Sequence, residues 1–132
     1  MDEQTKFLAY EAIDENVKDT TAREVIKYVL ECEVYGSMYV LKMSNTYLKN
    51  TIFVDEQTKA PRWNDMTLRK AIQLAKKSQF ITTTGRDRTR TFELNMQFLK
   101  GKMAEIVARE AVGKIDANVL SDLIDSSGIR DL

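Results

Sequence analysis

The chain has 132 residues, with 20 basic and 20 acidic side chains, no histidine and one cysteine. At 43% hydrophobic residues it is long enough to bury the core of one domain, which argues against a disordered protein. Cys32 has no partner for an internal disulfide, and zinc would need several Cys or His ligands, so we expect neither a disulfide nor a metal site. The sequence has no signal peptide and no apolar stretch of about 18 residues, which leads us to expect a cytoplasmic protein without a membrane segment.

Positive charge is concentrated in one part of this neutral chain. Residues 59–90 hold nine bases and two acids, a net charge of +7. Residues 1–33 hold four bases and nine acids, a net charge of −5, and residues 91–132 hold five and seven, a net of −2. Because phosphate is neutralised locally, a basic segment of this kind predicts a surface that binds a polyanion.

Two helices are predicted at the start of the chain. The first covers residues 2–17, where apolar residues recur at helical spacing: Phe7, Leu8, Tyr10, Ile13 and Val17. The second begins at Thr21, which forms the pattern of a capping box with Glu24, and runs to about Glu33 before Gly36 ends it.

A strand, a short helix and a loop are predicted next. Residues 37–42 are rich in strand-forming side chains. Ser44 is suited to be the N-cap of a short helix that ends near Phe53. Residues 54–63 are polar and include Pro61, the only proline, which predicts a loop.

The strongest helix signal begins at Asn64. As N-cap, Asn64 has Trp63 before it and Leu68 at the fourth helical position, which is the arrangement of a hydrophobic staple. One face is apolar: Leu68, Ala71, Ile72 and Ala75. The opposite face is polar and mostly basic: Met66, Arg69, Lys70, Gln73, Lys76 and Lys77.

After Phe80 the pattern alternates with a period of two. Residues 81–84 and 89–94 predict the strands of a β-hairpin whose tip, residues 85–88, bears arginines. Its strands are rich in threonine, which favours strands before it suggests phosphate ligands.

Two helices are predicted after the hairpin. Residues 95–112 carry an apolar stripe of Leu99, Met103, Ile106 and Val107, and Gly113 would stop this helix. A last short helix is expected from Asp116, as N-cap, to Gly128.

The order helix, strand, helix, helix and hairpin over residues 21–94, about 74 of the 132, resembles the winged helix-turn-helix fold. Residues 66–81, followed by Gly85-Arg86-Asp87-Arg88 and Phe92-Glu93-Leu94, look like a recognition helix running into a wing. Small bacterial, phage and plasmid regulators and replication initiators share this pattern. Their turn between the two helices is usually a few residues, whereas residues 54–63 supply about ten, so either this loop is an insertion near the binding surface or the helix before it is misassigned.

The resemblance implies an α+β, mostly α, fold with a winged helix-turn-helix core, a small antiparallel β wing and flanking N- and C-terminal helices. We expect a single domain over residues 1–132. It would comprise an N-terminal helix at 1–20, the core at 21–94 and C-terminal helices at 95–132 that provide a dimer interface.

The basic residues fit the chemistry of duplex DNA. A helix fits the major groove, where Arg69 is suited to guanine and Gln73 to adenine, while lysines contact phosphates. Arg86 and Arg88 would reach the flanking backbone or minor groove. The candidate DNA-binding residues are Lys59, Arg62, Asn64, Met66, Thr67, Arg69, Lys70, Gln73, Lys76, Lys77, Arg86, Arg88 and Arg90.

Other interpretations of these residues remain open. The basic helix face is also what a solvated helix presents, Trp63 fits a structural staple better than a base-stacking platform, and Cys32 is best explained as a packed helix residue. Without histidine or a Gly-rich phosphate loop, we expect no enzyme and no cofactor. RNA binding is less favoured, because aromatic residues do not alternate with the bases.

We therefore expect a sequence-specific double-stranded DNA-binding protein that regulates transcription in a bacterium, phage or plasmid. A homodimer is expected because the apolar stripe of residues 95–112 needs a cover, although the N-terminal helix is an alternative cover. One alternative is a replication or conjugation accessory protein. Another is a protein-interaction module whose basic face docks an acidic partner, for which the acidic first third of the chain is a candidate.

Overall fold

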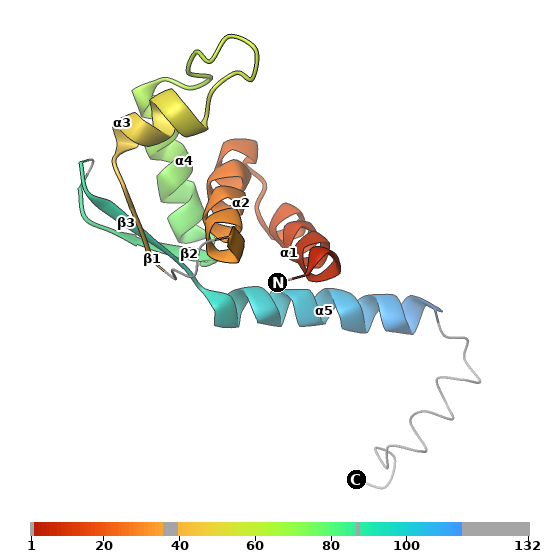
Figure 1. The fold of residues 1–132 in the computed structure, drawn as a ribbon. Helices are drawn as coiled ribbons and strands as arrows, with labels where there is room; N and C mark the ends of the chain where they lie inside the picture. The colour runs from red at the N-terminus through yellow and green to blue at the C-terminus, as the bar shows by residue number, and fades with distance from the viewer. Residues whose placement is uncertain (1, 36–39, 87, 115–132) are drawn as a thin grey trace, which may run out of the picture.

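The computed structural model describes residues 2–35, 40–86 and 88–114. In this part of the chain the fold is mostly helical α+β, with five α-helices, one π-helix and a three-stranded antiparallel sheet (Figure 1). The elements in chain order are α1 (Glu3–Asn16), α2 (Thr20–Tyr35), β1 (Val40–Met43), α3 (Asn45–Tyr47), the π-helix η1 (Leu48–Ile52), α4 (Asp65–Lys77), β2 (Ile81–Thr84), β3 (Arg90–Leu94) and α5 (Met96–Lys114). The helix predicted from Asp116 and the start of the strand predicted at 37–42 lie outside the described residues.

The sheet has the order β1-β3-β2, and both pairs are antiparallel. Phe92 of the central strand is paired with Leu41 on one side and Thr83 on the other. In β2 and β3 buried and exposed side chains alternate, which confirms the predicted hairpin. The turn needs its glycine: Gly85 has φ +91°, and a Cβ there would lie 2.5 Å from the Thr89 carbonyl oxygen.

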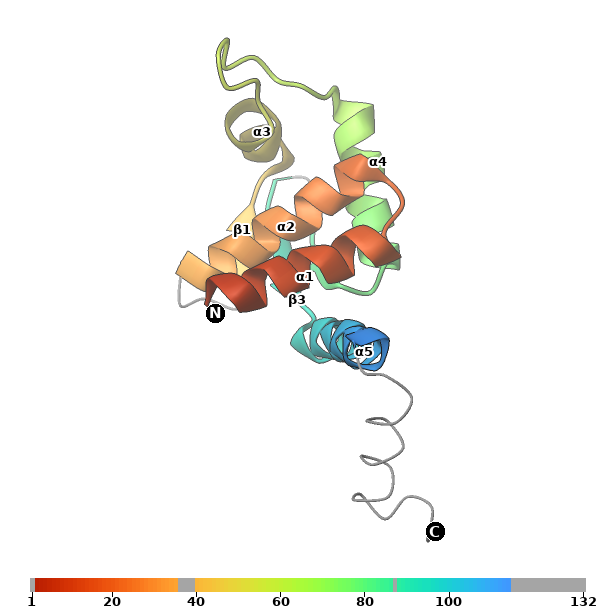
Figure 2. The same ribbon diagram turned by 90° about the vertical axis from the view of Figure 1, so that its right-hand side faces the viewer.

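One core joins the helices to the sheet. Helix α2 packs against α4 and against β1 and β3 of the sheet, and α4 also contacts β2. Phe80 at the end of the α4–β2 connection and Phe92 in the sheet are both fully or almost fully buried. Figure 2 shows α1 in front of α2 with α5, seen end-on, below it.

Helix α1 covers the apolar side of α5 within the same chain. The two helices pack against each other, and Leu99, Met103 and Ile106 are buried. An ion pair of 2.6 Å between Arg109 and Glu15 also joins them. The apolar stripe predicted in residues 95–112 is therefore covered by α1, the cover that was the alternative to a dimer partner. Its fourth residue, Val107, is 53% exposed. The expected stop at Gly113 is wrong, since α5 continues through Gly113 to Lys114, the last residue that the structure describes.

Two local expectations about the first helices are wrong. Phe7 is 70% exposed, because α1 turns Ala9, Ala12 and Ile13 toward the core instead. The capping box expected at Thr21 is replaced by a cap two residues earlier, at Asp19.

Asp19 is the residue that caps α2. Its Oδ1 accepts hydrogen bonds from the Thr21 hydroxyl and, at 2.9 Å, from the backbone N–H of Ala22. Glu24 is consequently not needed at the helix end, and its carboxylate binds Arg62 instead. The hydrogen bonds from Thr21 and from the Ala22 backbone hold the pKa of Asp19 below its ordinary value.

Replacing Asp19 with alanine should destabilise the fold by about 1 kcal/mol, the usual cost of losing an N-cap. Because the pKa of Asp19 is lowered in the folded protein, its contribution is present above the carboxyl's unfolded pKa and is lost as the pH falls through the folded one. Asp19→Asn keeps an acceptor at low pH, so its stability should fall less between neutral and acidic pH. Thermal unfolding of the three proteins across this range tests both effects, and identical acid sensitivity of Asp19→Asn and the unaltered protein would contradict the assignment.

Candidate nucleic-acid interface

Helix α4 begins as its sequence predicts. The Asn64 side chain accepts a hydrogen bond of 2.7 Å from the Thr67 backbone N–H, which satisfies one of the free donors at the helix start. The side chain of Asn64 is therefore engaged in capping, and Thr67 is half-buried. Both were candidate DNA contacts, and in this structure their described contacts serve the helix.

The two faces of α4 are as predicted. Its buried residues are Leu68, Ala71, Ile72 and Ala75, and the helix packs against α2. The residues predicted for the opposite side are all exposed: Met66, Arg69, Lys70, Gln73, Lys76 and Lys77.

The exposed residues of α4 form a central stripe and a flank. Met66, Lys70, Gln73 and Lys77 follow one another at intervals of four, three and four residues, so they lie along one line opposite the buried face. Arg69 and Lys76 lie on one flank of this line, seven residues apart. We call these six residues the α4 basic face. Lys76 and Lys77 also lie in the last turn, where positive charge offsets the helix dipole, so part of their role is structural.

The hairpin carries three arginines with different surroundings, Arg86 and Arg88 in its turn and Arg90 in β3. Arg86 and Arg88 are exposed, and with Gly85, Thr89 and Arg90 they line a hollow of about 690 Å³. Arg90 is half-buried and its Nε–H donates to Asn45 Oδ1 at 3.2 Å, which ties the hairpin to the start of α3. Figure 1 shows the end of the hairpin on the left, on the side away from α1 and α2.

The loop of residues 54–63 is held in a defined shape. An isolated β-bridge joins Val54 to Pro61. Asp55 Oδ1 accepts the backbone N–H groups of Gln57 and Thr58, each at 2.9 Å, and the hydrogen bonds from Thr58 and Gln57 lower the pKa of Asp55. This confirms a loop between the predicted helices, and the helical segment before it at Ser44–Phe53 is present as α3 and η1.

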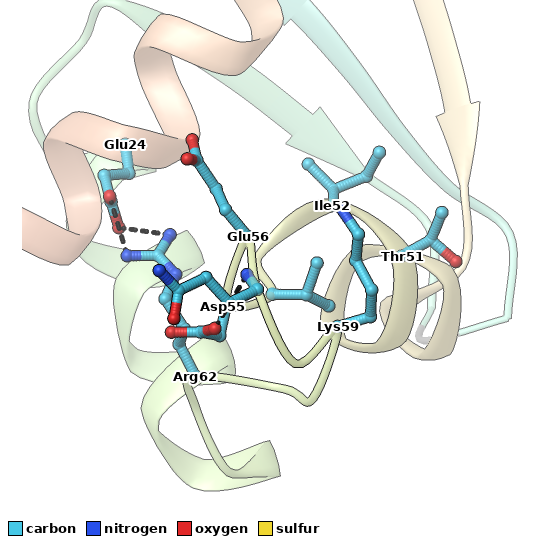
Figure 3. A pocket seen from close by; sticks show the side chains of 9 residues that line it. Glu24, Thr51, Ile52, Asp55, Glu56, Lys59 and Arg62 are labelled. Atoms are coloured by element: carbon cyan, nitrogen blue, oxygen red, sulfur yellow. Dashed lines mark hydrogen bonds and ion pairs between the residues drawn. The ribbon is translucent and has the colours of Figure 1, made fainter.

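The two basic candidates in this loop differ. Lys59 is exposed, with φ +61°. Arg62 binds the carboxylate of Glu24 on α2 through two of its N–H groups, at 3.0 and 3.2 Å. Together with other loop residues these side chains line a pocket of about 790 Å³ between the loop, η1 and α2 (Figure 3).

Comparison with known proteins gives no relative. No protein-family model, curated protein or solved structure matches this chain. The interface is accordingly interpreted from its own residues.

Within residues 2–35, 40–86 and 88–114, no group of three or more Cys, Asp or Glu side chains is arranged to hold a metal ion. Among the helices of the described part, none is both long enough and apolar enough to span a membrane.

Sequence reasoning did not find the partners of the basic residues. Glu24 is 38 positions from Arg62, and Asn45 is 45 positions from Arg90. Periodicity and capping patterns report only on neighbours in the chain, so no local signal connects these pairs. Lys49 of η1, which binds Asp65 at 3.2 Å and fixes the first turn of α4, was missed for the same reason.

Proposed function

We propose that this chain is a sequence-specific double-stranded DNA-binding protein of the winged-helix type that acts as a transcriptional regulator. The observation that carries the proposal is the exposed α4 basic face together with an arginine-bearing hairpin on the side away from α1 and α2 (Figures 1 and 2). Two exposed basic elements that follow each other in a chain neutral overall suit the polyanionic surface of a duplex.

The arrangement of the elements supports the winged-helix part of the proposal. Helix α2, β1, the α3–η1 segment, α4 and the β2–β3 hairpin follow in the order on which the resemblance rests. β1 joins the hairpin as a third strand, so the hairpin is anchored to the body of the protein. The ten-residue loop before α4 remains a departure from the pattern of these families.

The dimensions and chemistry of α4 support binding in the major groove. A helix about 10–12 Å across fits a groove about 12 Å wide. In this position Arg69 would bind guanine O6 and N7, and Gln73 would bind adenine N6 and N7. Lys70, Lys76 and Lys77 would bind phosphates, which fixes the position of the helix without selecting a sequence.

Selection of bound duplexes from a random pool, carried out at two salt concentrations, tests this function. We expect a recovered sequence motif, and binding that weakens as salt rises because counterions are released from phosphates. A salt-sensitive pool without any motif would instead support an architectural, replication or conjugation accessory role. Binding that does not depend on salt would exclude the proposed contacts with phosphate.

The hairpin gives a second test. Replacing Arg86 with alanine should weaken duplex binding by about eightfold at roughly 0.1 M salt, the effect of one lost phosphate contact. The matched control is Arg109→Ala on α5, which also removes an exposed arginine and should leave affinity within about twofold. Anisotropy titrations of a labelled duplex measure both. Equal losses in the two variants would contradict a specific role for the hairpin.

The alternative of an intramolecular cover stays a proposal: α2, in the acidic first third of the chain, binds Arg62 through Glu24 but leaves the α4 basic face exposed. Helix α1 packs against α2 and α5, and the α4 basic face stays exposed. An acidic partner in another molecule would still fit this face, and the selection experiment separates that case because it would recover no DNA.

The homodimer remains a proposal, but its first argument no longer holds. The α5 stripe that called for a partner is covered by α1 in the same chain. Sedimentation equilibrium at tens of micromolar protein distinguishes a monomer from a dimer. The mass of a dimer would support association through another surface, and the mass of a monomer would exclude the dimer.

A further inference from the structure

We propose that Arg62 and Glu24 form a latch that fixes the start of α4 against α2, so that Arg62 is a positioning residue for DNA binding and not a phosphate contact. Figure 3 shows the latch at one side of the pocket between the loop and α2. The proposal rests on the DNA-binding function proposed above, but part of its test is independent of DNA.

The contact between the two side chains is bidentate. Arg62 Nη1 lies 3.0 Å from Glu24 Oε1, and Nη2 lies 3.2 Å from Oε2, shown as dashed lines in Figure 3. Paired N–H donors facing both oxygens of a carboxylate fix the orientation of the guanidinium as well as its distance. A guanidinium held in this way is turned toward α2, and binding a phosphate with the same N–H groups would require breaking the pair.

A second set of contacts fixes the same region. Arg62 lies over the ring of Trp63, 5.4 Å from its centroid, and Trp63 stacks on Phe53 with centroids 4.5 Å apart. Phe53 in turn meets the edge of Tyr28, with centroids 5.9 Å apart. The Arg62 backbone N–H also donates to the Phe53 carbonyl at 3.0 Å.

These contacts form a closed path through α2. Glu24 and Tyr28 are four residues apart on that helix, so they lie on one face. Glu24 holds one end of the loop through Arg62, and Tyr28 contacts the other end at Phe53. Both ends of the loop are therefore attached to a single face of α2.

The latch lies immediately before the helix that we propose reads DNA. Asn64, the N-cap of α4, follows Arg62 by two residues. Together with the Lys49–Asp65 pair, the position of Arg62 therefore contributes to where the first turn of α4, including Met66, is presented. Small displacements of a recognition helix cost affinity, because its side chains must meet base edges within hydrogen-bond distance.

Glu24→Gln distinguishes positioning from direct contact with phosphate, since the two roles predict opposite changes in the affinity for duplex DNA. If Arg62 binds phosphate, removing the competing carboxylate frees it and strengthens duplex binding. If Arg62 positions α4, the same change weakens the latch and lowers affinity by up to about fivefold, the range of an exposed ion pair. The matched control is Glu56→Gln, which removes an exposed acid from the same pocket without touching the pair and should not lower affinity.

Exchanging the charges of Arg62 and Glu24 tests whether DNA binding can be restored. Arg62→Glu places two carboxylates against each other and should weaken binding more than Glu24→Gln does. Adding Glu24→Arg restores an ion pair in reversed order, and we expect most of the affinity to return. A phosphate contact would not be rescued, because position 62 would still carry a negative charge next to DNA.

Trp63 reports on the latch without DNA. It is the only tryptophan of the chain and is partly buried against the core. Releasing the loop should therefore shift its emission to longer wavelength in Arg62→Glu and restore it in the exchanged pair. If the unaltered protein binds no duplex, the proposed function fails while the emission still tests the latch. Unchanged emission in Arg62→Glu, or stronger duplex binding by Glu24→Gln, would overturn the latch itself.

Discussion

Replacing Lys70 and Lys77 together with alanine is expected to lower the affinity for duplex DNA by about sixtyfold at roughly 0.1 M salt. Both lysines lie on the exposed central stripe of α4. Each phosphate contact contributes about 0.9 to the slope of log affinity against log salt. At 0.1 M salt, one tenfold step below 1 M, one contact therefore raises the affinity by about eightfold. The salt dependence should also become less steep by about 1.8 units. Anisotropy titrations over a range of salt concentrations measure both quantities.

The matched control removes the same number of positive charges from another helix. Lys100→Ala with Lys102→Ala removes two lysines from α5, of which Lys102 pairs with the exposed Glu105 and lies over the Phe98 ring, 5.4 Å from its centroid. We expect an affinity within about threefold of the unaltered protein, because such surface pairs contribute little. Thermal unfolding should show all of these variants folded. An unchanged affinity and salt slope for the α4 variant would exclude this helix as the DNA-binding element.

The features that the sequence predicted well are those specified by neighbours in the chain. Asn64 as N-cap and the apolar spacing of Leu68 and Ile72 predicted α4 from its first residue. The change to alternation after Phe80, with Gly85 at the turn, predicted the hairpin. In both cases the backbone hydrogen bonds that define the element are local, so a local pattern is sufficient.

The features that were missed depend on competition between nearby groups or on distant contacts. Thr21 and Glu24 matched a capping box, but Asp19 binds the free N–H of Ala22, and Glu24 pairs with Arg62. Phe7 has helical spacing with other apolar residues, yet the α1 surface that meets α2 and α5 is centred on small residues, which leaves its ring outside. Packing between helices decides such cases, and a single sequence does not specify which helices will meet.

The π-helix shows a different limit. Residues 44–53 were predicted as one short helix, and the structure divides them into α3 and η1. π-helical turns are rare and have no reliable sequence signature, so spacing alone predicts the ordinary form. The Lys49–Asp65 pair, which joins η1 to α4, accompanies this turn.

Replacing Phe80 with alanine is expected to destabilise the protein by about 3–5 kcal/mol, a large part of the roughly 5–15 kcal/mol that stabilises a domain. Phe80 is completely buried and meets Phe98 of α5 edge to face, with centroids 5.0 Å apart. Its carbonyl accepts the Asn95 N–H at 2.8 Å. Removing the ring leaves a cavity where α4, the sheet and α5 meet. Chemical denaturation monitored by circular dichroism measures the change.

Phe7→Ala is the matched control, because it makes the same chemical change at a ring that is 70% exposed. Its cost should stay within about 0.5 kcal/mol. A similar cost for both variants would contradict the core assigned here. Phe80 also allows geometry to be tested apart from charge. It lies between α4, which carries the basic face, and β2, the first strand of the hairpin whose turn carries Arg86 and Arg88. If these elements bind one duplex together, Phe80→Ala should weaken binding under conditions where the protein is still folded, while the salt slope, which counts phosphate contacts, stays unchanged.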